Sequence, residues 1–346
     1  MAYTTINKST DYFDTSLWTG NSTSRLIPLD FEPSFVWGKA RSVATQHALF
    51  DAVRGATDRI KSDTNGAEVP NSGVTAFNSN GFTNGTSDSL NQNGQTFASW
   101  SWKANGSGSA NTDGSINSTV SASTTSGFSI VKYTGTQATA TVGHGLGIAP
   151  KMIFFKNVDI ADEWLAGVNA GSLDFTQYAY LNLTNAFSGN GAAFFNDTNP
   201  TSSVFSLGNS SNINKSGSSI IAYCFADVQG FSKIGSYIGN GNADGTFVYT
   251  GFKPAFILIK SATTAMYWHI FDDKRQGFNP NNYRLNPNSS EVETTTTGVL
   301  DFLSNGFKIR TNQQQFGTNG ATYIYMAFAA APFVANSGQS IPTTAR

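Results

Sequence analysis

An internal repeat constrains the fold of this chain more than any other feature of its sequence. Residues 73–82 (GVTAFNSNGF) return as residues 298–307 (GVLDFLSNGF), and seven of the ten positions are identical. Similarity of this kind indicates that one structural unit has been copied within the chain. We therefore expect related units rather than one irregular fold.

A second pattern occurs three times and sets the spacing of the copies. In each copy a proline precedes an apolar run, a lysine follows that proline by six residues, and a ring side chain follows it by 14 residues. The prolines are Pro33, Pro150 and Pro254, the lysines Lys39, Lys156 and Lys260, and the ring residues His47, Trp164 and Trp268. The last two prolines are 104 residues apart, which is enough chain for a domain with its own core. We predict three homologous domains, at residues 1–116, 117–229 and 230–346.

The pattern of apolar residues predicts strands. Residues 152–155 and 256–259 are continuous apolar runs, as expected for strands that are covered on both faces. The proline before each run suits a strand start, where no ladder hydrogen bond is lost. Residues 127–133 alternate between apolar and polar side chains, which is typical of a half-buried strand. The predicted fold is all-β, with three tandem β-sandwich domains of jelly-roll or lectin-like type.

Three segments fit this scheme less directly. Residues 41–62 carry alanines at helical spacing, but their third-copy counterpart contains a proline within residues 279–282, so we predict a strand and a loop. Residues 104–126 are rich in Gly, Ser, Asn and Thr, which predicts a linker or a loosely held strand. For residues 333–346 we expect an extended end.

Composition excludes several classes of function. The chain has three His and a single Cys, so neither disulfides nor redox or metal chemistry is expected. The net charge of −1 and a charged fraction of 12% favour binding to neither nucleic acid nor a membrane surface. No apolar stretch is long enough to span a bilayer, and the first residues lack a basic and apolar leader, so we expect no Sec-type signal.

Candidate ligand-binding residues are few. Trp164, Tyr267, Trp268 and His269 have side chains that can stack on a sugar ring, and they form the predicted glycan site. The recurrence of Trp at corresponding places in two copies favours a role in the core instead.

Catalytic and metal-binding patterns are weaker still. A glycosidase needs two carboxylates at a defined separation, and a pair such as Asp272 with Glu291 is open on sequence alone, although ordinary loop carboxylates explain both residues. The glycine-rich segment 143–147 precedes a strand and not a helix, so it lacks the geometry of a phosphate loop. The turn at residues 240–245 offers oxygen ligands for Ca²⁺ without EF-hand spacing. We predict no catalytic residue, no cofactor and no metal, and the question of Ca²⁺ stays open.

Several segments together resemble repeated domains of virion proteins from marine tailed bacteriophages, including cyanophages. Residues 143–147 (Gly-His-Gly-Leu-Gly) end the most specific of them. The resemblance covers most of residues 10–330 and is carried by residues 11–13, 18–20, 47–56, 101–104, 111–116 and 140–151. It implies a tail-fibre or other structural role in the particle, and it carries over no catalytic residue. Coiled-coil heptads and collagen-like repeats are absent, which favours a fibre tip or a particle decoration over a fibre shaft.

These observations lead to one expected function and two alternatives. We expect a non-enzymatic virion protein that is made in the host cytoplasm and contacts other virion proteins. Recognition of a host-surface glycan is an expected addition. Near-zero net charge and abundant aromatic residues predict a homo-oligomer, with a trimer as the expected state. The alternatives are a carbohydrate-binding module and a polysaccharide depolymerase.

Overall fold

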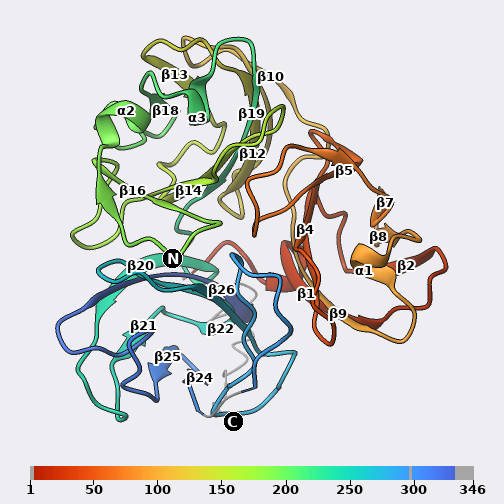
Figure 1. Cartoon of the computed structure of the whole chain (residues 1–346), viewed down its shortest axis with the longest axis vertical. Helices are drawn as coiled ribbons and strands as arrows, with labels where there is room; N and C mark the ends of the chain where they lie inside the picture. The colour runs from red at the N-terminus through yellow and green to blue at the C-terminus, as the bar shows by residue number, and fades with distance from the viewer. Residues whose placement is uncertain (1–3, 296–297, 332–346) are drawn as a thin grey trace.

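The computed structural model describes residues 4–295 and 298–331 and consists almost entirely of antiparallel β-sheet. Strands account for 43% of the residues and helices for 5%, which confirms the predicted all-β class. Three lobes surround a common centre, and each lobe is one continuous stretch of the sequence (Figure 1). The expected extended tail at residues 333–346 lies outside the described residues.

The strands recur in the same order in each lobe. Copy one contains η1 (Ser9–Asp11), β1 (Phe13–Thr19), β2 (Arg25–Pro28), β3 (Phe35–Ala40), β4 (Ala48–Asp51), β5 (Gly55–Ile60), β6 (Val69–Pro70), β7 (Val74–Asn78), β8 (Gly81–Asn84), α1 (Asp88–Asn91) and β9 (Thr96–Trp102). Copy two contains β10 (Ser109–Asn111), β11 (Ser118–Ser123), β12 (Phe128–Thr134), β13 (Ala140–Gly143), β14 (Met152–Asn157), β15 (Leu165–Val168), β16 (Gln177–Tyr180), β17 (Ser188–Gly189), α2 (Gly191–Phe195), β18 (Val204–Leu207), α3 (Ser211–Asn214) and β19 (Ser219–Phe225). Copy three contains β20 (Ser232–Ile238), β21 (Phe247–Tyr249), β22 (Lys253–Ser261), β23 (Trp268–Asp272), β24 (Leu300–Leu303), β25 (Gly306–Ile309) and β26 (Thr322–Ala331).

Each copy has a large sheet and a small sheet. The large sheets share an order of four strands, β1-β9-β3-β4, β12-β19-β14-β15 and β20-β26-β22-β23, and β12 is preceded in copy two by β10 and β11. The first strand of each set of four pairs with the last strand of the copy, the last strand pairs with the strand after the proline, and that strand pairs with the next. The small sheets are β2-β8-β7, β13-β18 and β21-β25-β24. Strand β10 lies before residue 116 and pairs with β11 of copy two.

Both faces of each large sheet are covered. The outer face packs on the small sheet of the same copy around a local apolar core, which contains Phe82 in copy one, Phe205 in copy two and Phe307 in copy three. The inner faces of all three large sheets contribute to one central core. This double burial explains why the runs after the prolines are apolar without alternation.

The central core has an approximate threefold arrangement. Trp102 and Phe225 end β9 and β19, and Phe328 lies in β26. These three residues stand opposite Phe35, Met152 and Phe256 respectively. The ring centroid of Trp102 lies 5.9 Å from that of Phe225 and 5.6 Å from that of Phe328. The ring centroids of the two phenylalanines are 6.2 Å apart. The three last strands therefore meet at one point, and the copies share their largest apolar core.

Local sequence accounts for the smaller elements. Residues 41–62 form β4 and β5 with a turn between them, as predicted, and residues 104–126 include β10 and β11 as ordered strands and not a loose linker. The two repeated Ser-Asn-Gly segments make two-residue hairpin turns at Ser79-Asn80 and Ser304-Asn305. Gly81 has a φ of 138° and a Cβ there would meet the Ile27 carbonyl oxygen at 2.1 Å, so glycine is required.

Candidate functional site

The structure places three of the four predicted glycan-stacking residues in the interior. Trp164 and Trp268 have no exposed surface and His269 is 1% exposed, whereas Tyr267 is 39% exposed. A ring with no accessible face cannot stack on a sugar. The prediction of a glycan site at these residues is therefore wrong for Trp164, Trp268 and His269, and the core role indicated by the repeat is correct for the two tryptophans.

Both tryptophans instead join neighbouring copies. Trp164 Nε1 donates to the Lys61 carbonyl at 2.8 Å, and Trp268 Nε1 donates to the Tyr180 carbonyl at 2.9 Å. At the corresponding place in copy one, His47 Nε2 lies 2.9 Å from the Asn286 carbonyl. Its Nδ1 accepts from Trp37 Nε1 at 2.9 Å, which assigns the proton to Nε2. We call these three hydrogen bonds the clasps: His47 to Asn286, Trp164 to Lys61 and Trp268 to Tyr180.

The clasps have the same local construction. The backbone N–H of each ring residue donates to a side-chain oxygen of its own copy: Asp63 for His47, Asn182 for Trp164 and Asn288 for Trp268. Each of these oxygen-bearing residues lies two positions after a clasp acceptor, Lys61, Tyr180 or Asn286. Copy one donates to copy three, copy two to copy one, and copy three to copy two. The clasps therefore close the three copies into a ring.

A buried charged network strengthens two of the three junctions. Arg54 pairs with Asp51, and Tyr223 of copy two donates its hydroxyl to Asp51 at 2.6 Å. Arg275 pairs with Asp272, and Trp100 Nε1 of copy one donates to Asp272 at 3.0 Å. These carboxylates are completely buried and satisfied by hydrogen bonds, as a buried ion pair requires.

The third junction replaces this network with apolar contacts. By strand register, Val168 takes the place of Asp51 and Asp272, and Met326 takes the place of Trp100 and Tyr223. Both side chains are buried in the central core. At this junction copy two lacks the carboxylate and copy three lacks the group that would donate to it. Because both are absent together, no buried polar group is left without a partner.

The three repeated lysines are buried as well. Lys39 Nζ donates to the carbonyls of Ala40 and Ser290, Lys156 Nζ to those of Asn157 and Ile160, and Lys260 Nζ to those of Thr184 and Met266. Burial lowers the pKa of Lys39 and Lys156 to about 8 and that of Lys260 to about 7. The acceptors Ser290 and Thr184 belong to neighbouring copies, so the amines of Lys39 and Lys260 support two of the junctions that the clasps close. Both acceptors of Lys156 lie in its own copy.

The other residues considered for chemistry are also occupied. Asp272 is fully buried beside Arg275 and is closed to a substrate, so the carboxylate pair with Glu291 does not form an accessible catalytic pair. In the turn at residues 240–245, Asp244 pairs with Lys308 at 2.7 Å, and this hydrogen bond lowers the pKa of Asp244. Cys224 is a buried free thiol, and burial raises its pKa to about 12. Among residues 4–295 and 298–331, no three His, Cys, Asp or Glu side chains gather as a metal site would require.

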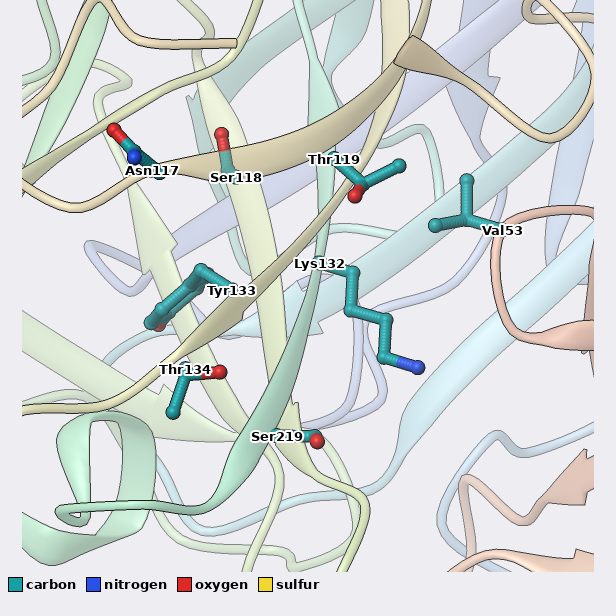
Figure 2. Close-up of a pocket in the computed structure, with 8 residues that line it drawn as sticks. All are labelled: Val53, Asn117, Ser118, Thr119, Lys132, Tyr133, Thr134 and Ser219. Carbon is teal, nitrogen blue, oxygen red and sulfur yellow. The ribbon is translucent and has the colours of Figure 1, made fainter. Parts of the chain in front are cut away.

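Open hollows on the surface are the remaining places for a ligand. One of about 390 Å³ lies on copy two beside Val53 of copy one. It is lined mainly by hydroxyl and amide side chains together with Lys132, which stands opposite Thr119 in the strand register (Figure 2). Its Tyr133 ring is 3% exposed, and Tyr133 donates its hydroxyl to the Ile213 carbonyl at 2.7 Å. The hollow therefore offers polar groups but no exposed ring for stacking.

A second hollow, of about 450 Å³, lies at the start of copy three. Its walls include Asp227, Gln229, Lys233, Tyr249 and Thr250. Tyr249 is 60% exposed. Tyr249 was not among the predicted ligand-binding residues. It lies in residues 247–249, where two aromatic residues flank an apolar one. In a strand, this pattern presents both rings on one face.

The fold and these sites define a β-protein of three copies closed around a shared core, with small surface hollows. The chain belongs to the family described as a domain of unknown function, DUF7483, which matches residues 8–332. No curated protein was found to match the sequence. No helix in the part of the chain that the structure describes is long and apolar enough to cross a membrane.

Proposed function

We propose that this chain is a non-enzymatic structural component of a bacteriophage particle, placed at a tail fibre, a tail tip or the particle surface. The observation that carries the proposal is the ring of three copies, which is held by buried clasps and a common aromatic core. Such a ring is stabilised without a cofactor and leaves the peripheral loops free to vary, which suits an exposed particle component. The sequence resemblance to virion proteins supports the same role.

We also propose that the protein self-associates, with a homotrimer as the expected state. Exposed apolar side chains support the proposal, among them Phe278 at 68% and Leu26 at 42% exposure. Light scattering on the purified protein tests it. A mass equal to one chain at every micromolar concentration would refute self-association and would leave attachment to another virion protein untouched.

A carbohydrate-binding module is the second candidate function. The observation that favours it is the exposed Tyr249 ring at the edge of a polar hollow. A depolymerase is less well supported, because the carboxylate pair named as an example in the sequence includes the inaccessible Asp272.

Immunogold labelling of purified particles tests the structural role. An antibody raised against the folded chain should label the tail or the capsid surface of particles from a phage that encodes it. Absence of the chain from purified particles, by labelling and by mass spectrometry, would contradict the proposal.

A further inference from the structure

The outward face of β21 differs from the corresponding faces in the other two copies. Val248 stands opposite Phe307 in the strand register, as Ile27 stands opposite Phe82 and Val142 opposite Phe205. Val248, Ile27 and Val142 are therefore equivalent positions in the three copies. The neighbouring outward positions hold Phe247 and Tyr249 in copy three, Leu26 and Pro28 in copy one, and Thr141 and Gly143 in copy two. In copy two the position of Gly143 is buried, and a Cβ there would meet the Asn111 side chain at 1.8 Å, so copy one is the relevant comparison. Since copy one holds Leu26 and Pro28 on an exposed face, the fold does not require aromatic residues there.

Both aromatic residues of β21 are open to solvent. Phe247 is 45% exposed and Tyr249 is 60% exposed, whereas Val248 between them is buried at 5%. Their side chains lie on one face of the strand, roughly 7 Å apart along it. The exposure of two aromatic residues on a strand that can do without them indicates a contact with a ligand.

Polar groups surround the Tyr249 ring on one side. The hollow of about 450 Å³ beside it is lined by Asp227, Gln229, Lys233 and Thr250. Asp227 and Lys233 form an ion pair at 2.7 Å, and Asp227 Oδ1 also accepts from the Ile234 backbone N–H at 2.7 Å. The Asp227 carboxylate is thus held in place. The ion pair remains accessible, because the Asp227 side chain is 26% exposed and the Lys233 side chain is 44% exposed.

We propose that this hollow binds a saccharide, with the Tyr249 ring stacking on one face of a sugar and the Asp227–Lys233 pair and Gln229 bonding its hydroxyl groups. A sugar ring has an apolar C–H face and a rim of hydroxyls that both donate and accept. An aromatic plate beside a fixed carboxylate, an amide and an ammonium matches those two requirements. This inference rests on the carbohydrate-binding candidate in the proposed function and assigns the sugar-contacting side chains to it.

The hollow favours a saccharide over a second copy of the chain. An interface between copies needs an apolar centre that excludes water, whereas this site places an ion pair and an exposed amide directly beside the ring. Copy one provides a comparison. Its hollow of about 320 Å³ also holds an ion pair, Asp14 with Lys274, and is lined by Trp18, but it has Pro28 where copy three has Tyr249. The Trp18 ring is half-buried and already stacks on Phe97, with ring centroids 5.7 Å apart. We therefore assign the saccharide site to copy three.

Saturation-transfer NMR on the full-length protein tests this assignment. The probes are the methyl glycosides of glucose, galactose, N-acetylglucosamine and glucuronic acid. The wild-type protein should transfer saturation to the ring C–H protons of at least one of them. Tyr249→Ala should weaken that binding by about ten-fold or more, and Tyr249→Phe should retain it, because the stacking face survives.

The matched control is Phe278→Ala, which removes another exposed aromatic ring of copy three from a different hollow and should leave binding unchanged. Circular dichroism confirms that each variant is folded. No saturation transfer from the wild-type protein to any of the four glycosides would overturn the proposal, as would equal transfer in Tyr249→Ala. Dissociation of an oligomer by Tyr249→Ala without a glycoside signal would identify the surface as a contact between copies and would also overturn it. Immunogold labelling of particles is independent of all these outcomes, so failure here and failure of the structural role are distinguishable.

Discussion

Trp164 shows what a single ring contributes to the junction between two copies. Its indole N–H is the donor of a clasp, whereas Trp102, equally buried, has an indole N–H without a hydrogen-bond partner among the described residues. Replacing either by Phe removes a similar volume from the central core. Only Trp164→Phe also leaves a partly buried carbonyl, that of Lys61, without this donor.

We therefore predict that Trp164→Phe destabilises the protein by about 1–3 kcal/mol more than Trp102→Phe does. Equilibrium urea denaturation of the two variants measures the difference in the free energy of unfolding. Equal losses would show that the Trp164 hydrogen bond contributes nothing to the junction.

The buried lysines predict a pH dependence of stability. Each has a pKa of 10.5 as its ordinary value, and burial lowers it in the folded protein to about 8 for Lys39 and Lys156 and about 7 for Lys260. Between these values the unfolded chain binds more protons than the folded one, so stability rises with pH. The contribution of these lysines to stability is complete above their pKa in the unfolded chain. It is lost as the pH falls through their lower pKa in the folded protein.

The free energy of unfolding should accordingly increase between about pH 7 and about pH 9. Asp273, whose pKa burial raises to about 7, titrates only at the lower end of this window, and the shift of Cys224 acts above its ordinary value of 9.0. Lys260→Met removes one of the three amines and should reduce the slope. A flat profile, or an unchanged slope in Lys260→Met, would contradict the assignment of the effect to the buried lysines.

Sequence patterns at this scale identified the right positions but not their roles. The common spacing from proline to ring residue marked His47, Trp164 and Trp268 as equivalent, and all three make clasps. The acceptors lie in other copies and are backbone carbonyls, which carry no side-chain signature in the sequence. Tyr249 was not predicted for a different reason. The sequence does not show which face of a strand is covered, so an exposed aromatic residue cannot be distinguished from a buried one until the strand register is known.

At the scale of strands and hairpins, the repeated Ser-Asn-Gly segments position one buried ring in each of the small sheets of copies one and three. Phe82 and Phe307 each occupy the second position of their strand and have no exposed surface, as the repeat predicts. Phe307→Ala should cost roughly 3–5 kcal/mol, because it removes a phenyl ring from a closed core. Phe247→Ala, on the exposed face of the paired strand β21, should change stability by about 0.5 kcal/mol or less. Chemical denaturation compares the two, and a loss well below 1 kcal/mol for Phe307→Ala would show that the small sheet packs loosely.

The strand order was less predictable than the strands themselves. Apolar runs after the prolines identified β14 and β22, and turn residues identified the hairpins. In each large sheet, however, the last strand of a copy inserts between the first strand and the strand after the proline. That pairing depends on contacts 57 to 97 residues apart, for which a single sequence carries no local signal.

The whole molecule combines local cores with one shared core, and this arrangement decides how it unfolds. Each copy has a sandwich core of its own, yet Trp102, Phe225 and Phe328 meet at the centre and every junction contains a clasp. Removing one copy would expose the inner faces of the other two large sheets. The repeat alone suggested separable domains, because sequence similarity between copies does not reveal where their faces are buried.

We therefore predict that the three copies unfold as one cooperative unit. Phe82→Ala lies in the local core of copy one, far along the chain from β14 and β22. If the copies are coupled, this substitution lowers the free energy of global opening, and the most protected amides of β14 and β22 exchange faster by the same factor as those of β3. Hydrogen–deuterium exchange, followed by mass spectrometry of peptides from each copy, measures all three at once. Faster exchange confined to residues of copy one would show that each copy is an independent domain, and the clasps would then hold together units that fold alone.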